Sequence, residues 1–302
     1  MKKYILLNLM FLLNNIYFSQ STIDYDLGME KYQAKKYNEA IIFFNQAIKL
    51  DSNQFLCYIN RGNSKAKIND LEGALLDFES SIKIDSTNAL SYYNLGVTKS
   101  KLKRTQEAII DFNKAIEINP RDAHSYCNRG MEKAKLKAYN EAILDYDNAI
   151  KLDSNLAAAF NNRGNSKSKL NEYSSAILDF NIAIKIDSTY SEAFYNRGTT
   201  KLKFQDNTAI IDFNKTIELN PYFAAAYYNR GLLFYFQNNI NNAIEDFNKT
   251  IEINPNYGEA YCNRGILKIT ILNDKENGCL DLVKSSKLGI TNATESLKLY
   301  CH

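Results

Sequence analysis

Histidine, tryptophan and proline are scarce in this sequence of 302 residues, which has two, none and three of them. No glycine-rich phosphate loop or nucleophile elbow is present. His124 lies near Asp122 and Cys127, but the repeat described below places it on a helix surface, and His302 is the last residue. Because the usual catalytic groups are missing, we expect no catalytic residues, no cofactor and no enzymatic activity.

The charges show no large excess of either sign. The chain has 37 Lys and Arg against 34 Asp and Glu, and two of the basic residues, Lys2 and Lys3, belong to the leader described next. A nucleic-acid-binding protein concentrates Lys and Arg on one face. We therefore expect no nucleic acid partner.

The only long apolar run is at the N-terminus. Basic residues precede it, the run covers residues 4–18, and Ser19, Gln20 and Ser21 follow, which is the layout of a secretory signal. The run is too short to span a membrane comfortably. We expect residues 1–21 to be removed and the protein to be exported, periplasmic or secreted, with no integral membrane span. A buried amphipathic N-terminal helix is the alternative.

Glycine, in contrast, recurs at a regular interval. Eight of the twelve glycines are 34 residues apart, except for one step of 33. These are Gly28, Gly62, Gly96, Gly130, Gly164, Gly198, Gly231 and Gly265. Such a period predicts a solenoid of stacked units, which occupies about residues 21–290 and leaves no room for a second domain.

Large residues alternate with small ones within each repeat. If the glycine is position 8, then position 4 is aromatic, position 20 is alanine and position 24 is aromatic in nearly every repeat. Positions 4, 8 and 11 share one helix face and positions 20, 24 and 27 share another. All three prolines fall at position 32, where a helix ends. Each repeat is therefore predicted to be a pair of helices.

This pattern resembles the tetratricopeptide repeat over roughly 270 of the 302 residues. The resemblance implies an all-α, right-handed superhelical solenoid of about eight helix-turn-helix units over residues 22–290, closed by a capping helix over residues 291–302. The sequence departs from the family pattern where Tyr or Phe replaces Trp, Arg replaces Leu at position 7 and Lys replaces an aromatic residue at position 11. The family resemblance implies a protein-interaction scaffold.

Position 7 is usually Arg and position 23 is usually Asp. Pairing them within a repeat leaves a single mismatch, Leu95 with Asp111, and pairing them between repeats leaves more. We therefore expect each Arg to bind the Asp of its own repeat and to tie the two helices together.

Position 6 carries a row of asparagines, which in related superhelices faces the concave surface. A carboxamide offers one acceptor and two donors, so the row is a candidate ladder for the backbone of an extended peptide. The alternative is that these side chains brace neighbouring repeats. The predicted ladder consists of Asn60, Asn94, Asn128, Asn162, Asn196, Asn229 and Asn263.

Position 13 carries a row of lysines that includes Lys101, Lys135 and Lys169. Such a row favours an acidic partner, and solvated lysines with no ligand are the alternative. At the seventh repeat the row stops, and Tyr235 and Phe236 take the place of small residues or Lys. They predict an apolar anchor for a partner or a second copy of the chain, with packing against the end cap as the alternative.

Together these patterns predict a non-catalytic scaffold that binds an extended peptide or a partner surface along the concave face, and the lysine row favours an acidic one. The alternative function is a rigid spacer or assembly factor in a cell-envelope complex.

Five cysteines are present, and none has a convincing metal-ligand spacing, so we expect no metal site. An odd number leaves at least one thiol outside any internal disulfide. Cys127 and Cys262 occupy one slot in distant repeats and cannot meet. Cys279 and Cys301 lie on consecutive antiparallel helices, each expected near mid-helix, and we predict that they pair.

Intact-mass analysis of the natural, denatured protein tests both the leader and the disulfide. We expect a mass that lacks the leader, and alkylation of two more cysteines after reduction than before it. Equal alkylation before and after reduction would exclude the disulfide, and a mass that includes residue 1 would exclude removal of the leader.

Overall fold

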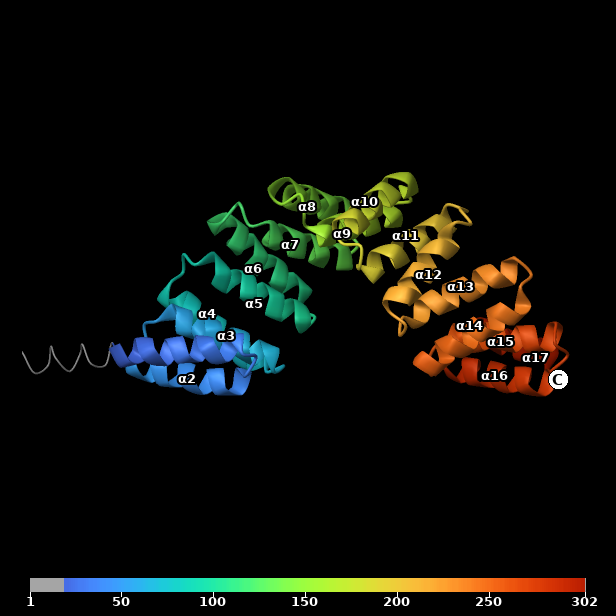
Figure 1. The fold of residues 1–302 in the computed structure, drawn as a ribbon, viewed down its shortest axis with the longest axis horizontal. Helices are drawn as coiled ribbons and strands as arrows, with labels where there is room; N and C mark the ends of the chain where they lie inside the picture. The colour runs from blue at the N-terminus through green and yellow to red at the C-terminus, as the bar shows by residue number, and fades with distance from the viewer. Residues whose placement is uncertain (1–18, 302) are drawn as a thin grey trace, which may run out of the picture. The chain divides into compact units, whose positions relative to one another are not determined.

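The computed structural model describes residues 19–301, so residues 1–18 of the predicted leader lie outside the described part of the chain. Within that part every regular element is a helix, in agreement with the predicted all-α class. The chain divides into two compact units, which we call unit 1, ending at Ser154, and unit 2, beginning at Asn155. Each unit is a stack of helix pairs (Figure 1).

Unit 1 contains four repeats. Its first repeat pairs the helical residues 19–33 with α2 (Tyr37–Leu50). The other three repeats pair α3 (Phe55–Lys67) with α4 (Leu71–Ile84), α5 (Ala89–Lys101) with α6 (Thr105–Ile118), and α7 (Ala123–Lys135) with α8 (Tyr139–Leu152).

Unit 2 contains four repeats and a final helix. The repeats pair α9 (Ala157–Lys169) with α10 (Tyr173–Ile186), α11 (Ser191–Lys203) with α12 (Ala209–Leu219), α13 (Ala224–Phe236) with α14 (Ile240–Ile253), and α15 (Gly258–Thr270) with α16 (Lys275–Lys287). The closing helix is α17 (Thr291–Tyr300). The missing residue of the sixth repeat falls in the turn before Ala209, where α12 is shorter than the other second helices.

The core of the first seven repeats is the contact between the repeated glycine and the aromatic ring at position 24, and the eighth repeat has Leu282 in place of the ring. In the fourth repeat, a Cβ atom on Gly130 would lie 2.8 Å from a ring carbon of Tyr146, too close for any side chain. In the eighth repeat, a Cβ atom on Gly265 would lie 2.9 Å from the carbonyl oxygen of Gly278. The position-20 alanines and position-24 rings are at most 1% exposed. The large-against-small pattern therefore predicts the packing correctly.

The C-terminal end is closed by α17, which packs against α15 and α16. A disulfide joins Cys279 to Cys301, whose Cα atoms are 5.8 Å apart. The expected mid-helix placement was wrong, because Cys279 lies in the first two turns of α16 and Cys301 is the residue that caps α17. The cross-link ties the end of the chain to the last repeat.

Position 15 of the first seven repeats, and the residue after it in the eighth, adopts a left-handed backbone conformation in the turn between the two helices. Four repeats place Asn there, which tolerates a positive φ, and the other four place Lys or Gln. The residues and their φ angles are Lys35 (59°), Asn69 (66°), Lys103 (61°), Lys137 (63°), Asn171 (65°), Gln205 (59°), Asn238 (58°) and Asn273 (55°). The sequence reading missed this turn because only half of these residues signal it.

Replacing Lys137 by Asn should stabilise unit 1, because Asn adopts φ 63° at less cost than Lys. We expect the free energy of unfolding to rise by about 0.5 kcal/mol. Lys151→Asn makes the same chemical change inside α8. It should lower the free energy of unfolding, since Asn favours helices less than Lys. Chemical denaturation measures both, and equal effects would contradict this account of the turn.

Candidate partner-binding surface

The position-6 asparagines use their amide nitrogens to hold neighbouring repeats together. In five of them Nδ2 donates to the residue at position 5 of the preceding repeat, which is Tyr in four cases. The bonds are Asn60 to Tyr25 Oη (3.1 Å), Asn128 to Tyr93 Oη (3.0 Å), Asn196 to Asn161 Oδ1 (3.0 Å), Asn229 to Tyr195 Oη (3.2 Å) and Asn263 to Tyr228 Oη (3.0 Å). This is the bracing alternative.

In these five carboxamides the donor atoms are therefore engaged within the chain, and peptide binding by the row stays a prediction. The two remaining members differ. Asn94 has a buried Nδ2 with no hydrogen-bond partner among residues 19–301, because position 5 of the preceding repeat is Ile59. Asn162 accepts a long bond of 3.4 Å from the amide of Asn161. What the braced asparagines can still offer a ligand is the acceptor atom Oδ1.

The sequence reading missed the tyrosines at position 5, although they directly precede the asparagines. Burial raises the pKa of Tyr93, Tyr195 and Tyr228, and the bond from the Asn amide lowers it by less. The phenols are therefore neutral at ordinary pH. The signal that could have identified these pairs is the recurrence of Tyr at position 5 directly before Asn at position 6, because the Tyr of one repeat then meets the Asn of the next.

The position-7 arginines bind the position-23 aspartates of their own repeats, as predicted. In the fourth repeat, Arg129 Nε donates to Asp145 at 3.0 Å, and Lys133 approaches the same carboxylate at 2.8 Å. Arg129 Nη1 also reaches Asn113 Oδ1 of the preceding repeat at 2.8 Å. The same pairs recur as Arg61–Asp77, Arg163–Asp179, Arg197–Asp212, Arg230–Asp246 and Arg264–Asp281.

The third repeat shows what happens without the arginine. Leu95 replaces it and is buried, and Asp111 keeps one cation, Lys99 at 2.7 Å. Burial raises the pKa of Asp111, because a single lysine offsets its desolvation less than two cations would. One cation is therefore enough for the repeat to form.

The lysine row is not uniform. Lys101 has no ion-pair partner among the described residues, whereas Lys135 binds the fully buried carboxylate of Glu132, which also accepts a bond from Ser100. In unit 2, Lys169 lies close enough to Lys203 to lower its pKa, although burial is the larger cause. Lys135 is thus a weaker candidate for an acidic partner than Lys101 and Lys169.

Two pockets, one in each unit, are lined by residues at equivalent repeat positions, between the second and third repeats of unit 1 and between the last two repeats of unit 2. The polar pocket of unit 1 has a volume of about 280 Å³ and the apolar pocket of unit 2 about 190 Å³. The polar pocket is lined by Tyr32, Asn63, Ala66, Lys67, Phe78, Asn94, Val97, Thr98 and Lys101. The apolar pocket is lined by Leu232, Tyr235, Phe236, Phe247, Asn263, Ile266 and Leu267. Each residue of the second set occupies the repeat position of a residue in the first set.

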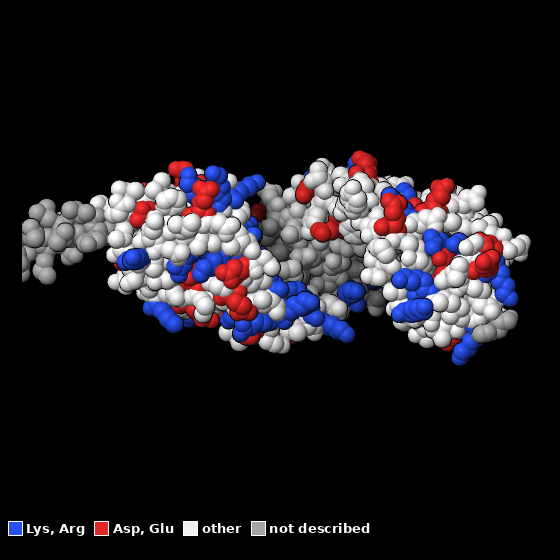
Figure 2. Space-filling view, turned by 90° about the horizontal axis from the view of Figure 1, so that it is seen from below, with Lys and Arg blue, Asp and Glu red and all other residues white. Residues whose placement is uncertain are grey.

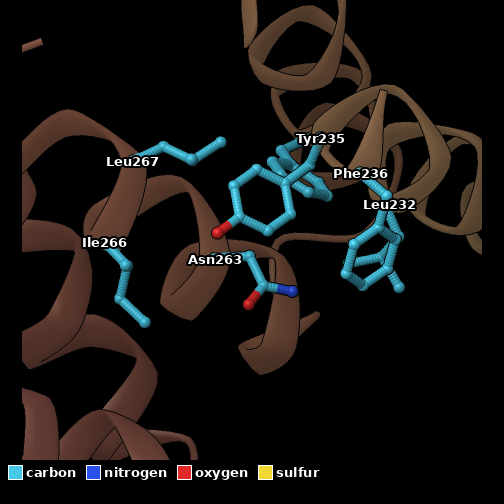
Figure 3. A pocket seen from close by; sticks show the side chains of 7 residues that line it. Leu232, Tyr235, Phe236, Asn263, Ile266 and Leu267 are labelled. Carbon is cyan, nitrogen blue, oxygen red and sulfur yellow. The ribbon is translucent and has the colours of Figure 1, made fainter. Parts of the chain in front are cut away.

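The apolar pocket contains the two aromatic residues that the sequence singled out. The rings of Tyr235 and Phe236 lie 5.5 Å apart, and the residues are 41% and 77% exposed. They face Ile266 and Leu267 of the next repeat across the pocket, with the Asn263 carboxamide between the two sides (Figure 3). Packing against the end cap applies instead to Ile269, which lies against Gly278 of α16.

Other kinds of site find little support in the described residues. No three His, Cys, Asp or Glu side chains among residues 19–301 are grouped to hold a metal ion, and no helix there is long and apolar enough to cross a membrane. Cys57 is buried, which raises the pKa of its thiol to about 12 and leaves it unreactive at neutral pH. Basic and acidic side chains are interspersed on the face shown in Figure 2.

Comparison with protein families matches four stretches of the chain to one kind of repeat. The description "Tetratricopeptide repeat" matches residues 89–122, 224–257 and 25–54, and "TPR repeat" matches residues 130–170. No curated protein sequence matches the chain.

Several solved structures are similar. YrrB, described as a TPR protein with an unusual peptide-binding site, is 25% identical, with a TM-score of 0.50 over 61% of this chain and 95% of its own. A tetratricopeptide repeat protein from Parabacteroides merdae is 21% identical, with a TM-score of 0.62 over 82% and 99%. Cut9–Hcn1 of the APC/C is 15% identical, with a TM-score of 0.68 over 88% of this chain and 53% of that chain.

The helix pairs, the glycine-to-ring packing and the first-helix pockets define an all-α solenoid of the kind that serves as a protein-interaction scaffold. The chain belongs to the tetratricopeptide repeat family.

Removing Asp145 should destabilise the protein far more than removing its arginine. Asp145→Ala leaves Arg129 and Lys133 without their buried partner and should lower the free energy of unfolding by about 3 kcal/mol. Arg129→Leu recreates the arrangement of the third repeat and should cost about 1 kcal/mol. Chemical denaturation measures both values, and a larger loss for Arg129→Leu would refute this ranking.

Proposed function

We propose that this protein is a non-catalytic scaffold whose first-helix surface binds an extended segment of a partner protein. The observation that carries the proposal is the apolar pocket of unit 2, where Phe236 is 77% exposed. Five other repeats place Lys at the position of Phe236, so the fold does not need an aromatic ring there. An exposed aromatic pair beside a pocket is typical of an anchor for an apolar partner side chain.

The surroundings of the pocket favour a segment that also carries acidic groups. Lys169 and Lys203 precede Phe236 in the same row of unit 2, and neither has a carboxylate partner among the described residues. A carboxylate between them would relieve their mutual repulsion. The acceptor atom of Asn263, which lines the pocket, can take a backbone N–H of the same segment. The peptide-binding site named for the similar protein YrrB supports this mode of binding.

We also propose that the protein is exported. The layout of residues 1–21 supports removal of a leader, and the contacts of Ser21 limit where the cut falls. Ser21 is fully buried, donates to the carbonyl of Ala47 at 3.0 Å and accepts a bond of 3.1 Å from Gln54. A cut that keeps Ser21 preserves these bonds, so we place the end of the leader at or before Gln20.

A swap between the two pockets tests the binding function. Tyr235→Ala with Phe236→Lys gives the apolar pocket the residues that the polar pocket has, Ala66 and Lys67. The probe is a phage library of random linear peptides. We expect the unaltered protein to enrich peptides with an aromatic or large aliphatic residue, and the double variant to bind them about tenfold more weakly.

Tyr222→Lys is the matched control, because Tyr222 is 81% exposed in the same unit but lies outside the pocket. It should leave binding unchanged. If the unaltered protein enriches no peptide, or if the pocket variant enriches the same ones, the binding function is wrong and the rigid spacer is favoured.

A further inference from the structure

A row of exposed aliphatic side chains crosses the second helices of unit 1. Each member lies between the buried alanine of position 20 and the buried ring of position 24, two residues from both. Successive helix residues are rotated by about 100°, so this position points away from the core. The members, which we call the outer row, are Ile42, Leu76, Ile110 and Leu144, with exposures of 56%, 65%, 65% and 63%.

The fold does not require aliphatic residues at this position. In the seventh repeat the same position is Glu245, in a helix that buries Ala243 and Phe247 as completely as the others do. The outer row therefore contributes little to packing within the chain. Scattered exposed aliphatic residues need no explanation, but this position carries an exposed aliphatic residue in six consecutive repeats, the four of unit 1 and those of Leu178 and Ile211 in unit 2. Such regularity is typical of an interaction surface.

The spacing of the row points to its partner. A surface that contacts all four side chains must present apolar groups at the interval of this chain's own repeats. The outer row of a second copy has that interval. Interfaces between two identical copies use the same patch on both, so such a surface is complementary to itself in spacing.

The charges on the two sides of the row are also complementary. The side nearer the helix N-termini carries Glu39, Glu72, Glu107 and Glu141, with Lys36 and Arg104 paired to two of them. The side nearer the C-termini carries Lys49, Lys83, Lys114 and Lys151, with Glu117 paired to one of them, and also the acidic residues Glu79 and Asp147. Six of these charges have no ion-pair partner among the described residues, namely Glu72, Glu79, Glu141, Lys49, Lys83 and Lys151.

We propose that two copies of this chain associate through the outer rows of unit 1, about a twofold axis parallel to the row. In this arrangement the second helices of the two copies run in opposite directions. The glutamate side of each copy then faces the lysine side of the other. A twofold axis across the row would instead bring like charges together, so the charges select the first arrangement.

Sedimentation velocity over a micromolar concentration series tests the dimer. Leu76→Glu with Ile110→Glu places at two positions the residue that repeat seven already has, so the variant should fold. We expect the unaltered protein to form a dimer and this variant to dissociate at least about tenfold more readily. Leu178→Glu with Ile211→Glu changes the same position in unit 2 and should leave the dimer unaffected.

A charge exchange tests the orientation. Lys83→Glu with Lys151→Glu, and separately Glu72→Lys with Glu141→Lys, should each weaken self-association, and the two variant chains should form a mixed dimer when combined. Failure of the mixed dimer to form would overturn the orientation. A monomer at every concentration would overturn the proposal, as would a monomer that cosediments with anionic phospholipid vesicles, which would assign the outer row to a membrane surface.

Discussion

The close contact between a glycine on the first helix and an aromatic ring on the second is the constraint on which the rest of this structure depends. With no Cβ atom at Gly130, the ring of Tyr146 can lie against the backbone of the facing helix. A Cβ atom on Gly130 would also lie 3.1 Å from the carbonyl oxygen of Ala142, the alanine of position 20, so the two backbones meet closely there. Because the same contact recurs in the first seven repeats, the helices of these repeats meet in the same way and their outer positions fall into rows.

Polar side chains then join one repeat to the next. Arg129 binds Asp145 in its own repeat and Asn113 in the one before, so one guanidinium holds three helices. The Asn128 amide does the same work with Tyr93. These residues recur at most of the junctions between repeats. Most of the regularly repeated polar side chains therefore hold the helices together, so fewer of their hydrogen-bonding groups are available to a partner.

The two units differ at repeat positions whose side chains are not needed for packing between helices or repeats. The polar and apolar pockets are built from the same repeat positions, and Phe236 in place of Lys67 or Leu232 in place of Asn63 changes the polarity of the pocket lining within the same repeat fold. Glu245 is a similar departure: it replaces the exposed aliphatic residue that the other second helices carry at this repeat position. Departures from the repeat pattern are thus better guides to function in this protein than the pattern itself.

The sequence by itself determined the interactions that lie within one repeat. The spacing from glycine to ring and from Arg to Asp is nearly constant along the chain, so helical periodicity alone pairs them correctly. The order of the last helices also predicts that Cys279 pairs with Cys301, but it does not predict where each cysteine lies within its helix.

The tertiary structure decided everything that depends on the neighbouring repeat. Whether an asparagine is braced depends on what stands at position 5 of the repeat before it, which is why Asn94 opposite Ile59 differs from Asn128 opposite Tyr93. The neutralisation of Lys135 by Glu132 and the depth of the two pockets also became visible only when the helices were placed side by side. The period of a repeat states which residues are equivalent, but the contacts of a side chain depend on the residue that faces it across the junction.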